Sequence, residues 1–138
     1  MALRITVIGA GPGGYTAAFD AAKRGAEVTL VESRWLGGTC LNCGCIPTKT
    51  LKSSAEALET IRRAAEFGIA GAGAPAVDMP AVIARKRKVT ETLQGGLEKT
   101  CAKLKVKLVM GRGQVVNAGL VKVTLADCTV QDIEGDRV

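Results

Sequence analysis

Apolar and polar residues near the start of the chain follow the pattern of a strand, a helix and a second strand. Segment 3–8 is apolar and rich in β-branched residues and ends at a glycine, as a buried strand does. The alanines of segment 12–24 give a helix with a face of small residues, and Gly25 follows it. Residues 28–32 form the next buried strand. Because the unit occupies only about 30 residues, we expect the two strands to pair in parallel through a right-handed crossover.

Two longer helical patterns follow. Apolar residues recur every three or four positions over about residues 46–65, which predicts a helix lying on a sheet. A second apolar stripe predicts another helix over about residues 80–103. Gly95 and Gly96 lie inside this second helix. Since each glycine costs about 1 kcal/mol relative to alanine, we expect a close-packing point or a kink there.

From about residue 105 the apolar period changes to two. Segments 105–108, 121–125 and 129–131 are predicted as strands of an antiparallel meander, and residues 136–138 as the start of a further strand. The fold class is therefore α/β: a Rossmann-like parallel βαβ domain, incomplete over residues 1–138, with a small antiparallel meander.

Composition narrows the classes of function. The chain has 19 Lys and Arg against 13 Asp and Glu, hence a net charge of +6, and much of this charge is expected on a solvated helix face. Aromatic residues make up only 3%, so a nucleic-acid module with stacking platforms is not expected. No apolar run approaches the roughly 18 residues that span a bilayer. Five cysteines without a secretion signal favour a reducing compartment, and we expect a cytoplasmic protein without membrane or nucleic-acid partners.

The sequence GAGPGG at residues 9–14 is a G-x-G-x-x-G motif between a predicted strand and a predicted helix, the context of a dinucleotide-binding turn. Gly9 permits the tight turn, Gly11 lets a pyrophosphate approach the backbone, and Gly14 lets helix and strand pack closely. Glu32 ends the second strand, where its carboxylate can accept hydrogen bonds from ribose hydroxyls and would repel a 2′-phosphate. The motif alone does not distinguish FAD from NAD.

Three cysteines lie within six residues, at positions 40, 43 and 45. A Cys40–Cys45 disulfide requires an irregular backbone over residues 42–44, because a regular helix would hold the two Cα atoms about 8.6 Å apart. A Cys40–Cys43 pair would suit a helical turn, as in C-x-x-C thiol exchangers. A metal site lacks a nearby fourth ligand, and the chain contains no histidine. Burial of all three as small apolar residues is the remaining alternative.

The segment LGGTCLNCGCIPTK at residues 36–49 closely resembles the redox-active signature of the pyridine nucleotide-disulfide oxidoreductases. Within that family, Leu41-Asn42 and Ile46-Pro47 look most like the dihydrolipoyl dehydrogenase branch. The resemblance covers the whole chain and is most specific over residues 9–32 and 37–49. Position 43 is usually aliphatic in the family, so Cys43 is an extra thiol, interpreted as a buried substitute for valine. Cys101 and Cys128 match no family site and are interpreted as structural.

The resemblance implies that the dinucleotide is FAD and that the redox pair is Cys40 with Cys45. Cys40 would exchange with the dithiol substrate, Cys45 would stack against the flavin, and Lys49 would tune the flavin from near its N5 atom. Gly113 would pass close to the adenosine half. The implied cofactor-binding residues are Gly9, Gly11, Pro12, Gly13, Gly14, Glu32, Ser33, Gly38, Thr39, Cys40, Gly44, Cys45, Lys49 and Gly113.

The resemblance also implies the reaction of a longer protein. Dihydrolipoamide and NAD⁺ would give lipoamide and NADH, in a homodimer that acts on dihydrolipoamide or a lipoyl-bearing protein. The family's catalytic base is a histidine from the partner subunit, and this chain has none. We therefore expect residues 1–138 to be the N-terminal part of an FAD/NAD(P)-binding domain that is inactive alone. Two alternatives remain open: a free-standing thiol-exchange or redox-sensing module, and a non-catalytic dinucleotide or metal binder.

Overall fold

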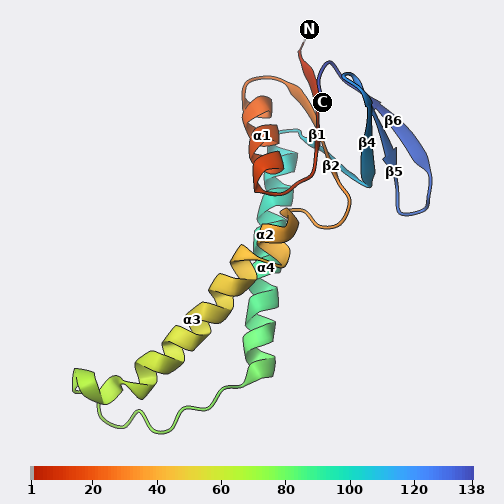
Figure 1. Ribbon diagram of the computed structural model, residues 1–138. Helices are drawn as coiled ribbons and strands as arrows, with labels where there is room; N and C mark the ends of the chain where they lie inside the picture. Colours follow the sequence, from red (N-terminus) through yellow and green to blue (C-terminus); the bar gives the residue numbers. More distant parts are fainter. Residues whose placement is uncertain (1) are drawn as a thin grey trace.

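The computed structural model describes residues 2–138 (Figure 1). Its elements, in chain order, are β1 (Arg4–Ile8), α1 (Pro12–Lys23), β2 (Glu27–Glu32), α2 (Gly38–Asn42), α3 (Cys45–Arg62), the 3-10 helix η1 (Ala64–Phe67), α4 (Met79–Lys103), β3 (Lys107–Met110), β4 (Arg112–Asn117), β5 (Leu120–Thr124) and β6 (Val130–Glu134).

A parallel sheet in the order β1-β2-β3 confirms the predicted βαβ unit. Ile5 pairs with Val28 in β2, and Leu30 of β2 pairs with Leu108 of β3. The sequence prediction was wrong about this third strand, which it placed in the antiparallel meander. The alternation that suggested a meander strand, over residues 105–108, begins before β3. Within β3, Leu108 packs on the helical side of the sheet and Val109 on the meander side, so the alternation did not reveal the parallel neighbour.

The antiparallel meander consists of β4, β5 and β6 and begins at Arg112 rather than near residue 105. It covers one face of the parallel sheet through a buried cluster of Val31, Val109, Val121 and Val123. Helix α1 and the end of α4 cover the other face (Figure 1). The parallel sheet is therefore the middle layer of three.

The apolar core on the helical side joins α1, β2 and α4. Ala18 and Leu30 are fully buried there, and Cys101 of α4 is 4% exposed. Small residues on α1 let the helix approach the sheet closely, as the alanine pattern predicted. The packing of α1 and α4 on this side of the sheet therefore determines where the carboxyl ends of β1 and β2 lie.

Helices α3 and α4 form an arm that extends away from the sheets (Figure 1). The prediction that the first long helix lies on a sheet was wrong, because α3 packs against α4 instead. Its apolar residues line a groove with the chain that precedes α4, and Leu51 and Ile61 remain partly exposed. The expected close-packing point at Gly95 and Gly96 was also wrong, since a Cβ at either would meet open space.

The last described residues return to the edge of the parallel sheet. Thr6 N–H donates to the carbonyl of Arg137 (3.0 Å), and Arg137 pairs in parallel with Ile5. A single β-bridge therefore forms where the sequence predicts the start of a further strand. Over residues 2–138, no helix has both the length and the apolar character needed to cross a membrane.

Candidate functional site

The glycine-rich loop connects β1 to α1 with the backbone that the motif predicts. Gly9 has a φ of +94° and its N–H donates to the carbonyl of Val31 (2.7 Å), which draws the loop over the end of β2. A Cβ at Gly14 would collide with the carbonyl of Gly9. At Gly11 a Cβ would meet nothing within 4 Å. There is thus no free space beside the loop at Gly14, where the helix packs on it, whereas the space beside Gly11 is free.

Helix α1 presents its N-terminus at this opening. Gly11 is the N-cap, no side chain caps the helix, and its first turn contains no acidic residue. The free N–H groups and the helix dipole therefore face the open side of the loop and suit an anionic group such as a pyrophosphate.

Glu32 lies at the end of β2 and is 8% exposed. One carboxylate oxygen accepts the N–H of Ala10 and the other accepts the N–H of Arg34, both at 2.8 Å. These bonds tie the glycine-rich loop to the segment that leaves β2. They hold the carboxylate at the carboxyl end of the parallel sheet, where α/β folds bind nucleotides.

The cysteine-containing segment of residues 36–49, called the redox segment below, packs directly on the glycine-rich loop. Gly37 N–H donates to the carbonyl of Ala10 (2.8 Å). A Cβ at Gly38 would lie 2.7 Å from the Cα of Gly11, so only glycine fits there without movement. Two motifs that are separate in the sequence thus lie in direct contact.

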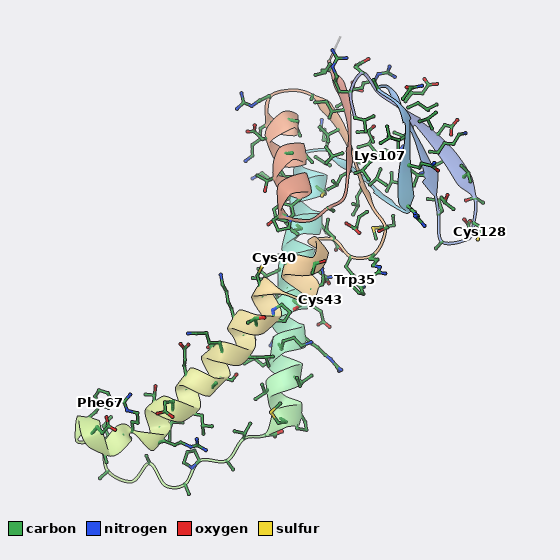
Figure 2. The ribbon with its side chains drawn as sticks, viewed as in Figure 1. Trp35, Cys40, Cys43, Phe67, Lys107 and Cys128 are labelled. Atoms are coloured by element: carbon green, nitrogen blue, oxygen red, sulfur yellow. A yellow bond between two sulfur atoms is a disulfide. The ribbon has the colours of Figure 1, made fainter. Side chains whose placement is uncertain are left out.

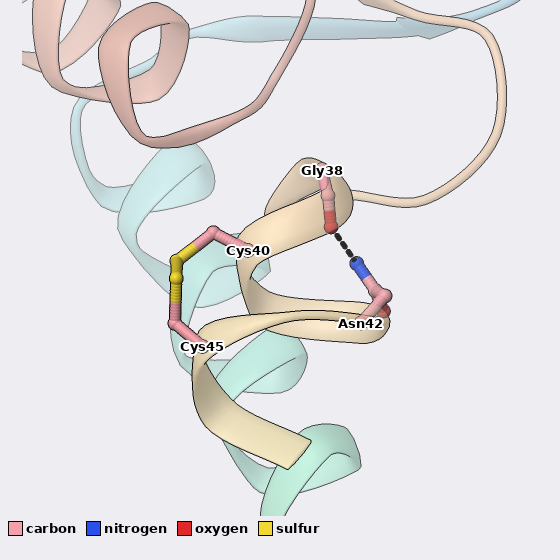
Figure 3. The surroundings of a disulfide bond; sticks show 4 residues. All are labelled: Gly38, Cys40, Asn42 and Cys45. Atoms are coloured by element: carbon pink, nitrogen blue, oxygen red, sulfur yellow. Dashed lines mark hydrogen bonds between the residues drawn. A yellow bond between two sulfur atoms is a disulfide. The ribbon is translucent and has the colours of Figure 1, made fainter. Parts of the chain in front are cut away.

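A disulfide joins Cys40 of α2 to Cys45, the first residue of α3 (Figure 3). The two Cα atoms are 4.8 Å apart, because the helix breaks between Asn42 and Cys45. Gly44 has φ of −120° and ψ of −106°, well outside the helical region. The observed pairing is the one that the family resemblance implies, and it has the irregular backbone that the spacing demands.

Asn42 and Gln94 hold the redox segment in place, and the sequence did not single out either as a site residue. The amide nitrogen of Asn42 donates to the carbonyl of Gly38 (2.8 Å) (Figure 3). It also donates to the carbonyl of Leu36 (3.1 Å). Gln94 of α4 donates in turn to the amide oxygen of Asn42. This contact spans 52 residues, so no local pattern could have revealed it.

The other expected site residues lie around this centre. Lys49 is exposed and lies four residues, about one helical turn, after Cys45. Thr39 is exposed on α2, and Pro12 and Gly13 are exposed in the first turn of α1. A Cβ at Gly113 would touch Ile8 and Val31 at 3.3 Å, so β4 crosses the carboxyl ends of β1 and β2. Ser33 lines a hollow of about 390 Å³ beside Gly111 and Arg112.

The three remaining cysteines are free thiols. Cys43 is exposed, so the interpretation as a buried substitute for valine was wrong: the helix break turns it away from the core. Cys101 is buried, and burial raises the pKa of its thiol. Cys128 lies in the β5–β6 turn, far from Cys40 and Cys43 (Figure 2). Among residues 2–138, no group of His, Cys, Asp or Glu side chains could hold a metal ion.

Comparison with known families agrees with this geometry. The model of the pyridine nucleotide-disulphide oxidoreductases matches residues 3–137. The chain belongs to this family. Membership implies flavin binding, and the family's name refers to a disulfide, which this chain has between Cys40 and Cys45.

Its curated relatives include several dihydrolipoyl dehydrogenases. That of Chlamydia muridarum is 45% identical over 117 residues, which cover 85% of this chain and 25% of the relative. That of Chlorobaculum parvum is 39% identical over 134 residues, covering 97% of this chain and 28% of the relative. The fold resembles the crystal structure of LpdA from Mycobacterium tuberculosis, with a TM-score of 0.83, 24% identity and coverage of 97% of this chain and 30% of the other. The chain thus spans about a quarter of the length of these two curated relatives.

Proposed function

We propose that this chain binds FAD between the glycine-rich loop and the redox segment, and that its Cys40–Cys45 disulfide exchanges with a dithiol substrate. The observation that carries this proposal is the contact of Gly38 with Gly11. It puts the disulfide segment against the only loop in residues 2–138 that combines a dinucleotide motif with an uncapped helix N-terminus. A dinucleotide held there would extend from Glu32 toward the disulfide.

The binding roles follow from the positions of the residues. The free N–H groups at the start of α1 would receive the pyrophosphate. It would lie against Gly11, Pro12, Gly13 and Gly14, of which Pro12 has no N–H to donate. Glu32 would accept ribose hydroxyl groups with its remaining lone pairs. Ser33 and Gly113 would flank the adenosine half, and Gly38, Thr39, Gly44 and Lys49 would flank the flavin half.

The cysteine chemistry would proceed by thiol–disulfide exchange. A substrate thiolate attacks Cys40 Sγ, the bond to Cys45 breaks, and Cys45 leaves as a thiolate. The second substrate thiol then attacks the mixed disulfide, which frees the Cys40 thiol and gives the oxidised, cyclic product. The N–H groups at the start of α3, together with Lys49, would stabilise the negative charge on Cys45. Bound FAD supplies the acceptor for the electron pair and its transfer to NAD⁺.

For the whole protein we propose the dihydrolipoyl dehydrogenase reaction, which converts dihydrolipoamide and NAD⁺ to lipoamide and NADH. Support comes from the names of the curated relatives and from the redox segment. The substrate would be free dihydrolipoamide or a lipoyl group on a partner protein, and the protein would act as a homodimer. The chain by itself contains no histidine to serve as a base. We therefore expect no NADH from dihydrolipoamide when these 138 residues are assayed alone.

Flavin binding by the purified chain tests the proposal. After incubation with FAD and gel filtration, the visible absorbance band of flavin should coelute with the protein. Gly11→Val should remove the band, since its Cβ would meet no atom of the fold within 4 Å while the side chain fills the space left for the pyrophosphate. Gly96→Val is the matched control, because it adds the same bulk at an open, exposed position on α4.

Circular dichroism of both variants would show that each is folded. A folded wild-type chain that elutes without flavin would contradict the proposal that these residues bind FAD. Equal flavin retention by both variants would contradict the placement of the pyrophosphate at Gly11.

A further inference from the structure

We propose that Cys43 is a third member of the redox centre and exchanges with the disulfide within the same chain. The Cys43 thiolate attacks Cys40 Sγ, a Cys40–Cys43 bond forms, the Cys40–Cys45 bond breaks, and Cys45 leaves as a thiolate. The number of S–S bonds is unchanged, so no oxidant or reductant is consumed. One proton is lost at Cys43 and one can be taken up at Cys45. This exchange does not depend on bound flavin and is independent of the function proposed above.

The backbone places the Cα atom of Cys43 within the range of Cα–Cα distances that disulfides span to Cys40. Cys43 N–H donates to the carbonyl of Thr39 (2.9 Å), so residues 39–43 close one turn of α-helix. In such a turn the Cα atoms of residues 40 and 43 are about 5 Å apart. This lies within the range of roughly 4.4–6.8 Å found for disulfides. The Cα–Cα distance between Cys40 and Cys45 is 4.8 Å. Cys40 therefore has two possible partners at nearly the same Cα–Cα distance. Because Cβ atoms three residues apart on a helix are about 5–6 Å apart and a disulfide needs about 3.5–4.5 Å, the bond to Cys43 also requires a small movement of the backbone at residue 43.

The local chain also permits the exchange. Cys43 is exposed, as is Cys45, so neither thiol has to leave an apolar core. Residues 43 and 44 belong to neither α2 nor α3. Moving the bond from Cys45 to Cys43 therefore requires rotation within a joint of two residues and leaves both helices intact.

The ends of the two helices favour this direction of attack. Cys45 is the first residue of the 18-residue α3, whose free N–H groups stabilise a leaving thiolate. Cys43 follows the last turn of α2, where no such donors are directed at it. A thiolate without that stabilisation is the better nucleophile, and a stabilised one is the better leaving group. The three cysteines thus divide into an attacking, a central and a leaving sulfur.

Disulfide mapping of the oxidised full chain tests the proposal. Trypsin should release all three cysteines in one peptide, Trp35–Lys49, and Cys128 in another, Val123–Arg137. The oxidised protein is alkylated rapidly at about pH 8, where an ordinary thiol is partly ionised, and tandem mass spectrometry locates the label. We expect label on Cys45 as well as Cys43, with the Cys45-labelled form at roughly a tenth or more of the peptide. That share corresponds to a preference of at most about tenfold for the original bond.

Cys43→Ala is the control, and its oxidised 35–49 peptide should carry no label, while Cys128 labels as in the wild type. Wild-type protein oxidised in denaturant, where all pairings form, shows that each labelled isomer can be detected. Label confined to Cys43 in the native wild-type protein would overturn the proposal.

A second variant tests the new bond directly. After mild oxidation, Cys45→Ser should protect both Cys40 and Cys43 from alkylation, because they bond to each other. The double variant Cys43→Ala with Cys45→Ser should leave Cys40 reactive. Free Cys40 and Cys43 in the oxidised single variant, with circular dichroism unchanged, would show that the Cys40–Cys43 bond does not form in this fold.

Discussion

At the scale of single residues, the site depends on two glycines that replace side chains with backbone contact. Gly38 has a φ of +60° and lies against Gly11, so it meets both a conformational and a spatial requirement. A methyl group there would push α2, and the disulfide with it, away from the glycine-rich loop. The two requirements can be separated experimentally, because other glycines of the chain meet only the first.

We predict that Gly38→Ala destabilises the chain more than Gly73→Ala. Gly73 has a similar φ of +64°, but a Cβ there would meet nothing within 4 Å. Gly73→Ala should therefore cost only the left-handed backbone conformation, about 1–2 kcal/mol. Gly38→Ala adds the collision with Gly11 and should exceed this by about 1–3 kcal/mol, in the range of core overpacking. Urea unfolding of both variants measures the difference, and equal losses would show that α2 moves freely.

At the scale of elements, the antiparallel meander is attached to the parallel sheet by its buried valines. Val121 and Val123 of β5 are fully buried against Val31 and Val109. The alternate residues Lys122 and Thr124 are exposed, so β5 has one apolar and one polar face. Because a Cβ at Gly113 of the neighbouring β4 would lie 3.3 Å from Ile8 and Val31, this attachment also sets the distance between β4 and the carboxyl end of the parallel sheet.

We predict that Val123→Ala lowers the free energy of unfolding by about 2 kcal/mol, since it removes two buried methyl groups and leaves a cavity. Val130→Ala, at a residue 58% exposed on β6, is the matched control and should change it by less than about 0.5 kcal/mol. Chemical denaturation followed by circular dichroism measures both values. Similar small losses in the two variants would contradict a meander docked through these valines.

An element could be predicted from the sequence where the residues that determine it lie close together in the chain. The βαβ unit, the glycine-rich loop and the cysteine segment could be predicted, because their spacing within the chain carries the signal. Strand β4 was missed, since Gly113 and the polar residues around it hide any alternation. The parallel pairing of β3 and the hydrogen bond from Gln94 to Asn42 depend on partners distant in sequence. A local sequence pattern contains no information about such partners.

At the scale of the whole molecule, the two ends of the described chain lie close together (Figure 1). Asp136 makes this contact: its carboxylate accepts the backbone N–H of Arg4 (2.8 Å) and pairs with the Arg4 guanidinium (3.5 Å). The N–H of Arg4, with its guanidinium, holds the pKa of Asp136 below its ordinary value. The contact therefore depends on an ionised carboxylate.

We predict that acid releases this contact. Because the pKa of Asp136 is lower in the folded chain, its stabilising effect is complete above the unfolded pKa of about 4. The effect is lost as the pH falls through the lowered value in the folded state. Amide NMR should show the Arg4 and Thr6 N–H signals shifting together below about pH 4, and Asp136→Asn should give the same shifts at neutral pH. Asp132→Asn, which removes only an exposed ion pair with Lys122, is the control and should leave both signals in place.

The disulfide closes a ring of only six residues, from Cys40 to Cys45. The conformational entropy that a cross-link removes from the unfolded chain grows with the length of the ring, and for six residues it amounts to about 2 kcal/mol, against nearly 5 kcal/mol for a ring of about 100 residues. Breaking this bond therefore destabilises the fold much less than breaking a disulfide that closes a long ring. The proposed thiol–disulfide exchange would therefore open and close this bond at less than half the loss of stability that a bond closing a ring of about 100 residues would cause.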